Sequence, residues 1–141
     1  MVRSCLCALR RPPWFAALCL ALLCAMPASS AADSGFPFDS ELLLDVKPMK
    51  GSKRVPILGI GPKGEAAIDL WCNSIEAQLV VVESTITIMT GRKTDRQCDP
   101  ARMRSDDELL ATLLQVTSWR REGDVLMLRG GKTLRFRQAT N

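Results

Sequence analysis

The segment VTSWRREGDVLMLRGGKTLRFRQ, residues 116–138, decides the fold class. It contains three strand-like runs, 116–121, 125–129 and 133–138. Two turn sequences separate them, EGD (122–124) and GG (130–131). In the last run Leu134 and Phe136 alternate with Arg135 and Arg137, so one face is apolar and the other is charged. This alternation is typical of an antiparallel sheet with one face in water.

The chain upstream adds further runs that are rich in β-branched residues or alternate apolar with polar residues. These runs are 41–47, 55–60, 65–72, 78–82 and 85–89. Glu83 and Ser84 predict a tight hairpin, and the polar stretch 91–99 predicts a loop. The pattern indicates a mainly β (α+β) fold, a small curved antiparallel sheet or barrel of about seven strands with one helix packed against it.

Two start signals precede the predicted helix. Asp99 and Pro100 place a capping side chain before a proline at the first helical position. Ser105 and Glu108 have the spacing of a capping box, which would put Asp106 and Asp107 in the first turn. The sequence leaves open one helix with a bend or a turn followed by a helix. The expected buried stripe is Leu109, Leu110, Leu113 and Leu114.

Residues 1–32 have the pattern of a cleavable secretory signal peptide. A basic start is followed by an uncharged apolar run at 14–26 and by the small residues 28–32, with cleavage expected after Ala31 or Ala32. The alternative is an uncleaved membrane anchor. The signal peptide predicts a periplasmic or secreted protein with a single domain at 33–141, in which no further apolar run is long enough to span a bilayer.

Of six cysteines, only Cys72 and Cys98 lie outside the predicted signal peptide. An even pair in an exported protein favours a disulfide, which would enclose 25 residues and contribute about 3 kcal/mol. Two buried free thiols are the alternative. The chain has no histidine, so a zinc site would need unusual carboxylate help, and we expect no metal or other cofactor.

The composition argues against an enzyme. Without histidine, nucleophile systems that pair Ser or Cys with His are excluded. The GGKT sequence at 130–133 lacks the earlier glycine of a phosphate-binding loop and reads as a hairpin turn. After residue 32 the chain has 16 basic and 15 acidic residues, a balance that argues against nucleic-acid binding.

Two residues are candidates for contact with a partner. Trp71 alternates out of phase with the apolar residues before it, so it is either an exposed anchor or packed under a loop. Asn73 reads most simply as a turn residue that ends its strand. Basic residues at 47–54, 92–96 and 102–104 could meet an anionic partner or form a solvated surface.

From about Ile57 to the C-terminus the chain resembles the META domain, the family that includes the HslJ-like heat-shock proteins. The matching stretches are WCN (71–73), TDRQC (94–98), the leucine-rich helix and GDVLML (123–128) with LRF (134–136). The family typically has Gly-Cys-Asn at the first place and Thr-Arg-Met-x-Cys at the second. Trp71 and Asp95 depart from this pattern, so the chain resembles a divergent member.

The resemblance implies an exported, non-enzymatic domain that supports the envelope or stress tolerance through protein or envelope contacts. It carries over no catalytic residues, only the two cysteines and Asn73 as structural positions. A periplasmic inhibitor of lysozyme or protease and a small lipocalin-like ligand-binding module are the alternatives, because small exported barrels also serve these roles. The partner, an envelope protein or a ligand, is not identified by the sequence.

Overall fold

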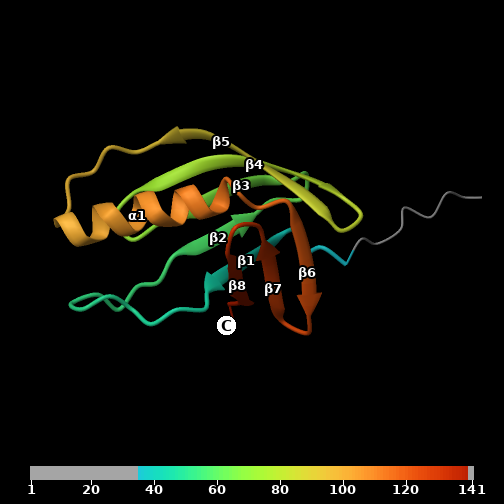
Figure 1. Ribbon diagram of the computed structural model, residues 1–141, viewed down its shortest axis with the longest axis horizontal. Helices are drawn as coiled ribbons and strands as arrows, with labels where there is room; N and C mark the ends of the chain where they lie inside the picture. Colours follow the sequence, from blue (N-terminus) through green and yellow to red (C-terminus); the bar gives the residue numbers. More distant parts are fainter. Residues whose placement is uncertain (1–34, 140–141) are drawn as a thin grey trace, which may run out of the picture. The chain divides into compact units, whose positions relative to one another are not determined.

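The computed structural model describes residues 35–139 and shows a closed antiparallel barrel with one helix (Figure 1). The predicted signal peptide, 1–32, lies outside the described residues. The elements in chain order are β1 (Ser40–Leu44), β2 (Ile57–Ile60), β3 (Glu65–Asp69), β4 (Ser74–Val82), β5 (Thr85–Lys93), α1 (Pro100–Leu113), β6 (Ser118–Glu122), β7 (Val125–Arg129) and β8 (Thr133–Gln138).

The barrel closes because β1 pairs with β8 as well as with β2, bringing Leu44 opposite Phe136. This confirms the expected barrel with one helix; the barrel has eight strands where about seven were expected. The hairpin at Glu83 and Ser84 is also confirmed, with Val82 opposite Thr85. Closing the sheet pairs the first strand with the last and so removes two of the edges that an open sheet would leave.

Large apolar side chains fill the barrel interior. The most completely buried of them come from five strands: Leu42, Leu58, Ile68, Leu126, Leu128 and Phe136. On β8, Phe136 is buried while Arg135 and Arg137 are exposed, as the alternation predicts. Trp119 on β6 also belongs to the core, where its ring lies 5.0 Å from that of Phe36 and its Nε1–H donates to the Glu83 carbonyl at 2.8 Å.

The helix begins at the first of the two predicted signals. The Asp99 carboxylate caps it by accepting from the N–H groups of Ala101 (3.1 Å) and Arg102 (3.2 Å), and Pro100 follows the cap. The predicted capping box was wrong, because Ser105 and Glu108 lie in the middle of one helix. A proline that already has a helical φ starts the helix one and a half turns earlier.

The expected stripe of four leucines is narrower in the structure. Leu109 and Leu113 are buried, Leu110 is partly buried, and Leu114 lies beyond the helix with 55 % of its surface exposed. The third fully buried residue on this face is Asp106, at helical spacing from Leu109 and Leu113. The helix therefore turns a carboxylate toward the protein interior.

Strand limits differ from the predicted ones around the disulfide. β3 ends at Asp69 rather than at residue 72, because Leu70 to Asn73 form a bend. β5 continues to Lys93, although 91–99 was predicted to be a loop. A β-bulge opposite Glu76 lets this polar end stay paired with β4, with Ile75 opposite Lys93.

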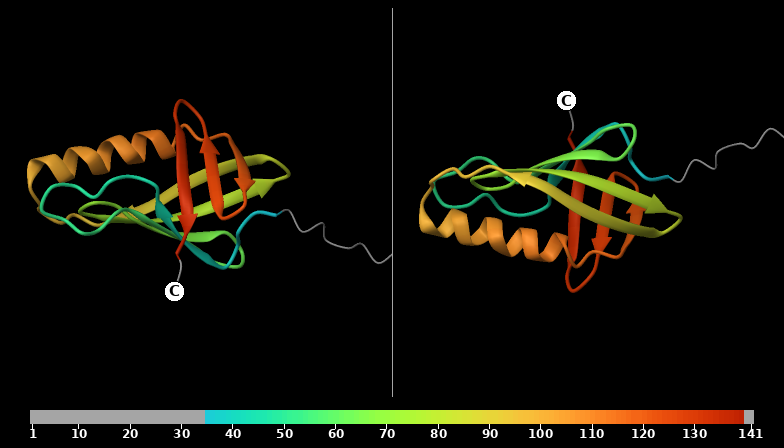
Figure 2. Two further views of the ribbon diagram at one scale, coloured as in Figure 1. Left: turned by 90° about the horizontal axis from the view of Figure 1, so that it is seen from below. Right: turned by 90° about the horizontal axis from the view of Figure 1, so that it is seen from above.

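The helix and the β6–β8 meander lie on the same side of the long β4–β5 hairpin (Figure 2). β5 pairs with β6 at a single position, where Thr85 faces Ser118. The barrel is therefore weakly hydrogen-bonded at this seam.

Candidate functional site

The bend between β3 and β4 is held by the buried carboxylate of Asp106. Oδ1 accepts from the backbone N–H groups of Trp71 (2.8 Å) and Cys72 (3.0 Å). Oδ2 accepts from the backbone N–H (2.9 Å) and the side-chain amide (3.2 Å) of Asn73. Asp106 is fully buried, so these four hydrogen bonds take the place of water around both carboxylate oxygens.

Asn73 connects this bend to the segment that follows β5. Its Oδ1 accepts from the Thr94 hydroxyl at 2.9 Å and from the Arg96 backbone N–H at 2.7 Å. The Thr94 hydroxyl oxygen in turn accepts from the Ser74 N–H at 3.0 Å. Asn73 was predicted to be a turn residue that ends its strand, but β3 already ends at Asp69 and Asn73 lies in the bend that leads into β4. It is buried and links three parts of the chain.

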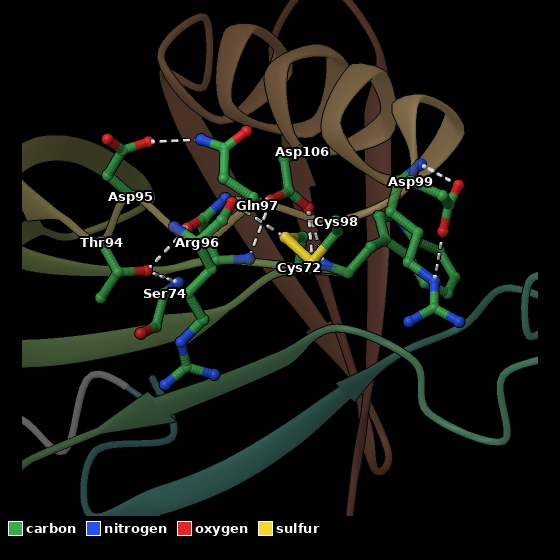
Figure 3. Close-up of a disulfide and its surroundings, with 12 residues drawn as sticks. Cys72, Ser74, Thr94, Asp95, Arg96, Gln97, Cys98, Asp99 and Asp106 are labelled. Carbon is green, nitrogen blue, oxygen red and sulfur yellow. Dashed lines mark hydrogen bonds and ion pairs between the residues drawn. A yellow bond between two sulfur atoms is a disulfide. The ribbon is translucent and has the colours of Figure 1, made fainter.

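A disulfide joins Cys72 in the bend to Cys98, one residue before the helix cap (Figure 3). This is the pairing that the sequence favours over two free thiols. The bend, the 94–98 segment and the start of α1 are thus tied together by one covalent bond and by hydrogen bonds to two buried side chains, Asn73 and Asp106.

A hollow of about 220 Å³ adjoins the bend, and we call it the Trp71 pocket. It is lined by Arg54, Asp69, Leu70, Trp71, Cys72, Asn73, Ser74 and Arg96. The structure thus brings both predicted contact residues, Trp71 and Asn73, to one pocket. Trp71 is half-buried at its wall rather than fully exposed or fully covered.

Two arginines line this pocket from different parts of the sequence. Arg54 ends the basic loop before β2, and Arg96 lies between β5 and the helix. Both are exposed, and among the described residues neither guanidinium forms an ion pair or a hydrogen bond. In Figure 3 the Arg96 side chain points away from the helix and carries no dashed line on its guanidinium.

The candidate site combines the Trp71 pocket with one buried carboxylate. Its buried carboxylate, Asp106, already accepts four hydrogen bonds and so has no free lone pair directed at the pocket. Within residues 35–139 no group of three or more acidic, cysteine or histidine side chains is placed to hold a metal ion. Over the same residues, no helix has the length and apolar character needed to cross a membrane.

Sequence reasoning missed Asp106 and Thr94 as parts of this site, and it named Arg54 only as one of the basic residues at 47–54 that could meet an anionic partner. One signal for Asp106 was present, since it occupies the same helix face as Leu109 and Leu113. An acidic residue on an apolar stripe needs hydrogen-bond donors from elsewhere in the fold. The sequence did not link Arg54 to Trp71, because the pairing of β2 with β3 brings the two residues to one pocket.

Comparison with known proteins gives the family. The META domain model matches residues 42–141. Among solved structures, the NMR structure of a protein from Burkholderia xenovorans superposes with a TM-score of 0.62 at 16% sequence identity, over 77% of this chain and 87% of that one. A second NMR structure gives a TM-score of 0.59 at 17% identity, over 74% and 92% of the two chains.

A search of curated protein sequences found no significant match. The two structural likenesses support the fold, and the family model covers all eight strands except the first two residues of β1. Together with the cysteine pair and the barrel, these findings identify the family: the chain belongs to the META domain family.

Proposed function

We propose that this protein is an exported, non-enzymatic META domain that supports the cell envelope under stress by binding an envelope component at the Trp71 pocket. The observation that carries this proposal is the pair of arginines, Arg54 and Arg96, that flank Trp71 without an ion-pair partner among the described residues. Charged side chains held beside an aromatic ring at a rigid bend are suited to recognising a partner.

The barrel interior argues against the lipocalin-like alternative. A carrier of this size needs an internal space for its ligand, whereas side chains such as Phe136, Leu58 and Ile68 are buried in the core here. A lysozyme or protease inhibitor would need a protruding loop. Residues 94–98 are tied to Asn73 and Cys72, so the loop at 47–54 is the one that we would test for that role.

Deletion and complementation in the native host test the proposal. We expect a deletion strain to be sensitised to heat or to membrane-active drugs, and the full chain to restore tolerance. The double variant Arg54→Gln, Arg96→Gln is expected to reach the same level in the envelope but to fail to restore tolerance. Arg129→Gln is the matched control, since Arg129 is an exposed arginine of β7 that does not line the pocket.

Two outcomes would contradict this function. Full complementation by the double arginine variant would show that the pocket is not the working surface. Stoichiometric inhibition of a lysozyme or protease by the purified protein, lost when residues 47–54 are replaced, would favour the inhibitor instead.

A further inference from the structure

We infer that the Trp71 pocket binds a phosphate monoester carried by a hydroxyl-bearing group such as a sugar. This inference rests on the proposed function and names the class of ligand. It is argued from three features of the pocket: its charge, its rigidity and the kinds of side chain that share its wall.

The charge of the pocket favours an anion with several oxygens. Arg54 and Arg96 bring two guanidinium groups to a hollow of about 220 Å³, and each guanidinium presents a planar fork of donors that matches phosphate oxygens. Two other basic side chains on the segments around the pocket are already engaged, since Lys93 pairs with Asp107 at 3.0 Å and Arg102 with Asp99 at 3.0 Å. Arg54 and Arg96 have no such partner among the described residues, so both guanidinium groups are available to an anion in the pocket.

The backbone around the pocket is fixed before any ligand arrives. Residues 71–73 donate their N–H groups to the buried Asp106 carboxylate, and the Arg96 N–H donates to Asn73. The disulfide at Cys72 and Cys98 holds the same two segments together. A binding site that is already ordered loses little conformational entropy on binding.

The remaining lining indicates what carries the phosphate. Asp69 adds one carboxylate to the same wall, which would repel a bare polyanion but can accept hydrogen bonds from hydroxyl groups. Trp71 offers an indole surface against which the carbon skeleton of a sugar can pack. A phosphate beside hydroxyl groups therefore fits this set of side chains better than a carboxylate or an inorganic polyanion.

Titration of the purified mature domain by nuclear magnetic resonance tests the inference. The probes are inorganic phosphate, glucose 1-phosphate and potassium chloride at matched ionic strength. We expect saturable shifts from glucose 1-phosphate at the Trp71 indole and at the amides of 71–74 and 96, with weaker shifts of the same signals from inorganic phosphate. Arg54→Gln and Arg96→Gln should each weaken binding about tenfold, whereas Arg129→Gln should leave it unchanged.

The same phosphate chemistry occurs on soluble sugar phosphates and on glycolipid headgroups, and vesicles distinguish the two sources. Binding to phosphatidylcholine vesicles that contain lipid A, but not to vesicles without it, supports a headgroup when Arg54→Gln with Arg96→Gln abolishes it. Binding of glucose 1-phosphate without vesicle binding supports a soluble ester. No saturable binding to any of these probes, or equal loss in Arg129→Gln, would overturn the inference.

These outcomes separate the ligand class from the proposed function. If the double arginine variant fails to restore tolerance in cells although no phosphate probe binds, the pocket is the working surface and the ligand class is wrong. If phosphate binds and the double variant still restores tolerance, the ligand class stands and the proposed function falls.

Discussion

Asp106 on α1 and Asn73, the residue before β4, are joined by two hydrogen bonds to one carboxylate oxygen, although they lie 33 positions apart in the chain. The backbone N–H of Asn73 donates at 2.9 Å and its side-chain amide at 3.2 Å. The other amide atom, Oδ1, accepts from the 94–96 segment. Asn73 therefore uses both ends of its side chain, and the helix, the bend and the post-β5 segment depend on each other.

The first prediction concerns the buried carboxylate. Asp106→Asn keeps the size of the side chain but directs an NH₂ group at backbone donors, so at least one buried N–H loses its acceptor. We expect the free energy of unfolding in urea to fall by about 1–3 kcal/mol. Asp107→Asn is the matched control, because Asp107 is 73% exposed in an ion pair with Lys93 and should cost under about 1 kcal/mol. Equal losses would show that the four hydrogen bonds contribute nothing measurable.

The second prediction concerns the disulfide and the same bend. Replacing Cys72 and Cys98 by alanine should lower the free energy of unfolding by about 3 kcal/mol while the circular dichroism spectrum stays native, since Asp106 still holds the bend. When Asp106→Asn is combined with the two cysteine replacements, the free energy of unfolding should fall by more than the sum of the two separate decreases. The reason is that the disulfide and the Asp106 hydrogen bonds hold the same bend, so each partly compensates for loss of the other. Strict additivity in this double-mutant cycle would mean that they act on independent parts of the structure.

The third prediction contrasts the two helix-start signals. Asp99→Ala removes the cap of α1 and should lower the free energy of unfolding by about 1 kcal/mol. Ser105→Ala should be neutral or slightly stabilising, because Ser105 lies mid-helix, where alanine is the better helix former. Chemical denaturation of both variants checks this, and the opposite ranking would restore Ser105 as the cap.

The start of α1 shows how much of the structure the sequence alone could predict. Asp99 and Pro100 were identified as a start signal from local chemistry, and that interpretation was correct. Ser105 and Glu108 satisfy the same kind of local rule, yet Asp106 between them is buried against a bend more than 30 residues away in the chain. Local patterns could not decide between the two signals, because the donors that satisfy Asp106 are brought to it by tertiary contacts.

The fourth prediction concerns two turn glycines with positive φ. At Gly123 (φ +57°) an added Cβ meets nothing within 4 Å. Gly123→Ala should therefore lower the free energy of unfolding by only about 1 kcal/mol, because alanine disfavours the left-handed backbone conformation. At Gly64 (φ +82°) the Cβ would collide with the Leu79 carbonyl oxygen. The Gly64 carbonyl also accepts from the Leu79 N–H at 2.7 Å. Gly64→Ala should therefore lower the free energy of unfolding by about 3 kcal/mol. Thermal unfolding of the two variants shows whether Gly64→Ala is the more destabilising.

The fifth prediction concerns export. The intact mass of the protein recovered from its native host should begin at Ala32 or Asp33 and be about two daltons lighter before reduction than after it. Protein made without residues 1–32 in a reducing cytoplasm is the control and should show no such difference. A full-length mass, or free thiols at both cysteines, would remove the basis for an envelope role.

The barrel strands were the most predictable part of the fold, and the Trp71 pocket was the least. Alternation in β8 and the turns at Gly123 and Gly130 are local features, and they indicated the C-terminal meander correctly. Trp71 was singled out because it broke an alternation, but its partners were not visible. Arg54 and Arg96 reach it only because Ile57 pairs with Asp69 and because Asn73 fixes the Arg96 backbone.

The single pairing between Thr85 and Ser118 has a consequence for how the barrel moves. Seven of the eight strand contacts are ladders of three or more residue pairs, whereas this one is a lone bridge. The amide protons beside it should exchange with solvent before those of any other barrel strand, because few hydrogen bonds must break to expose them. Local opening of the barrel is therefore expected to begin between β5 and β6, where a single residue pair closes the sheet.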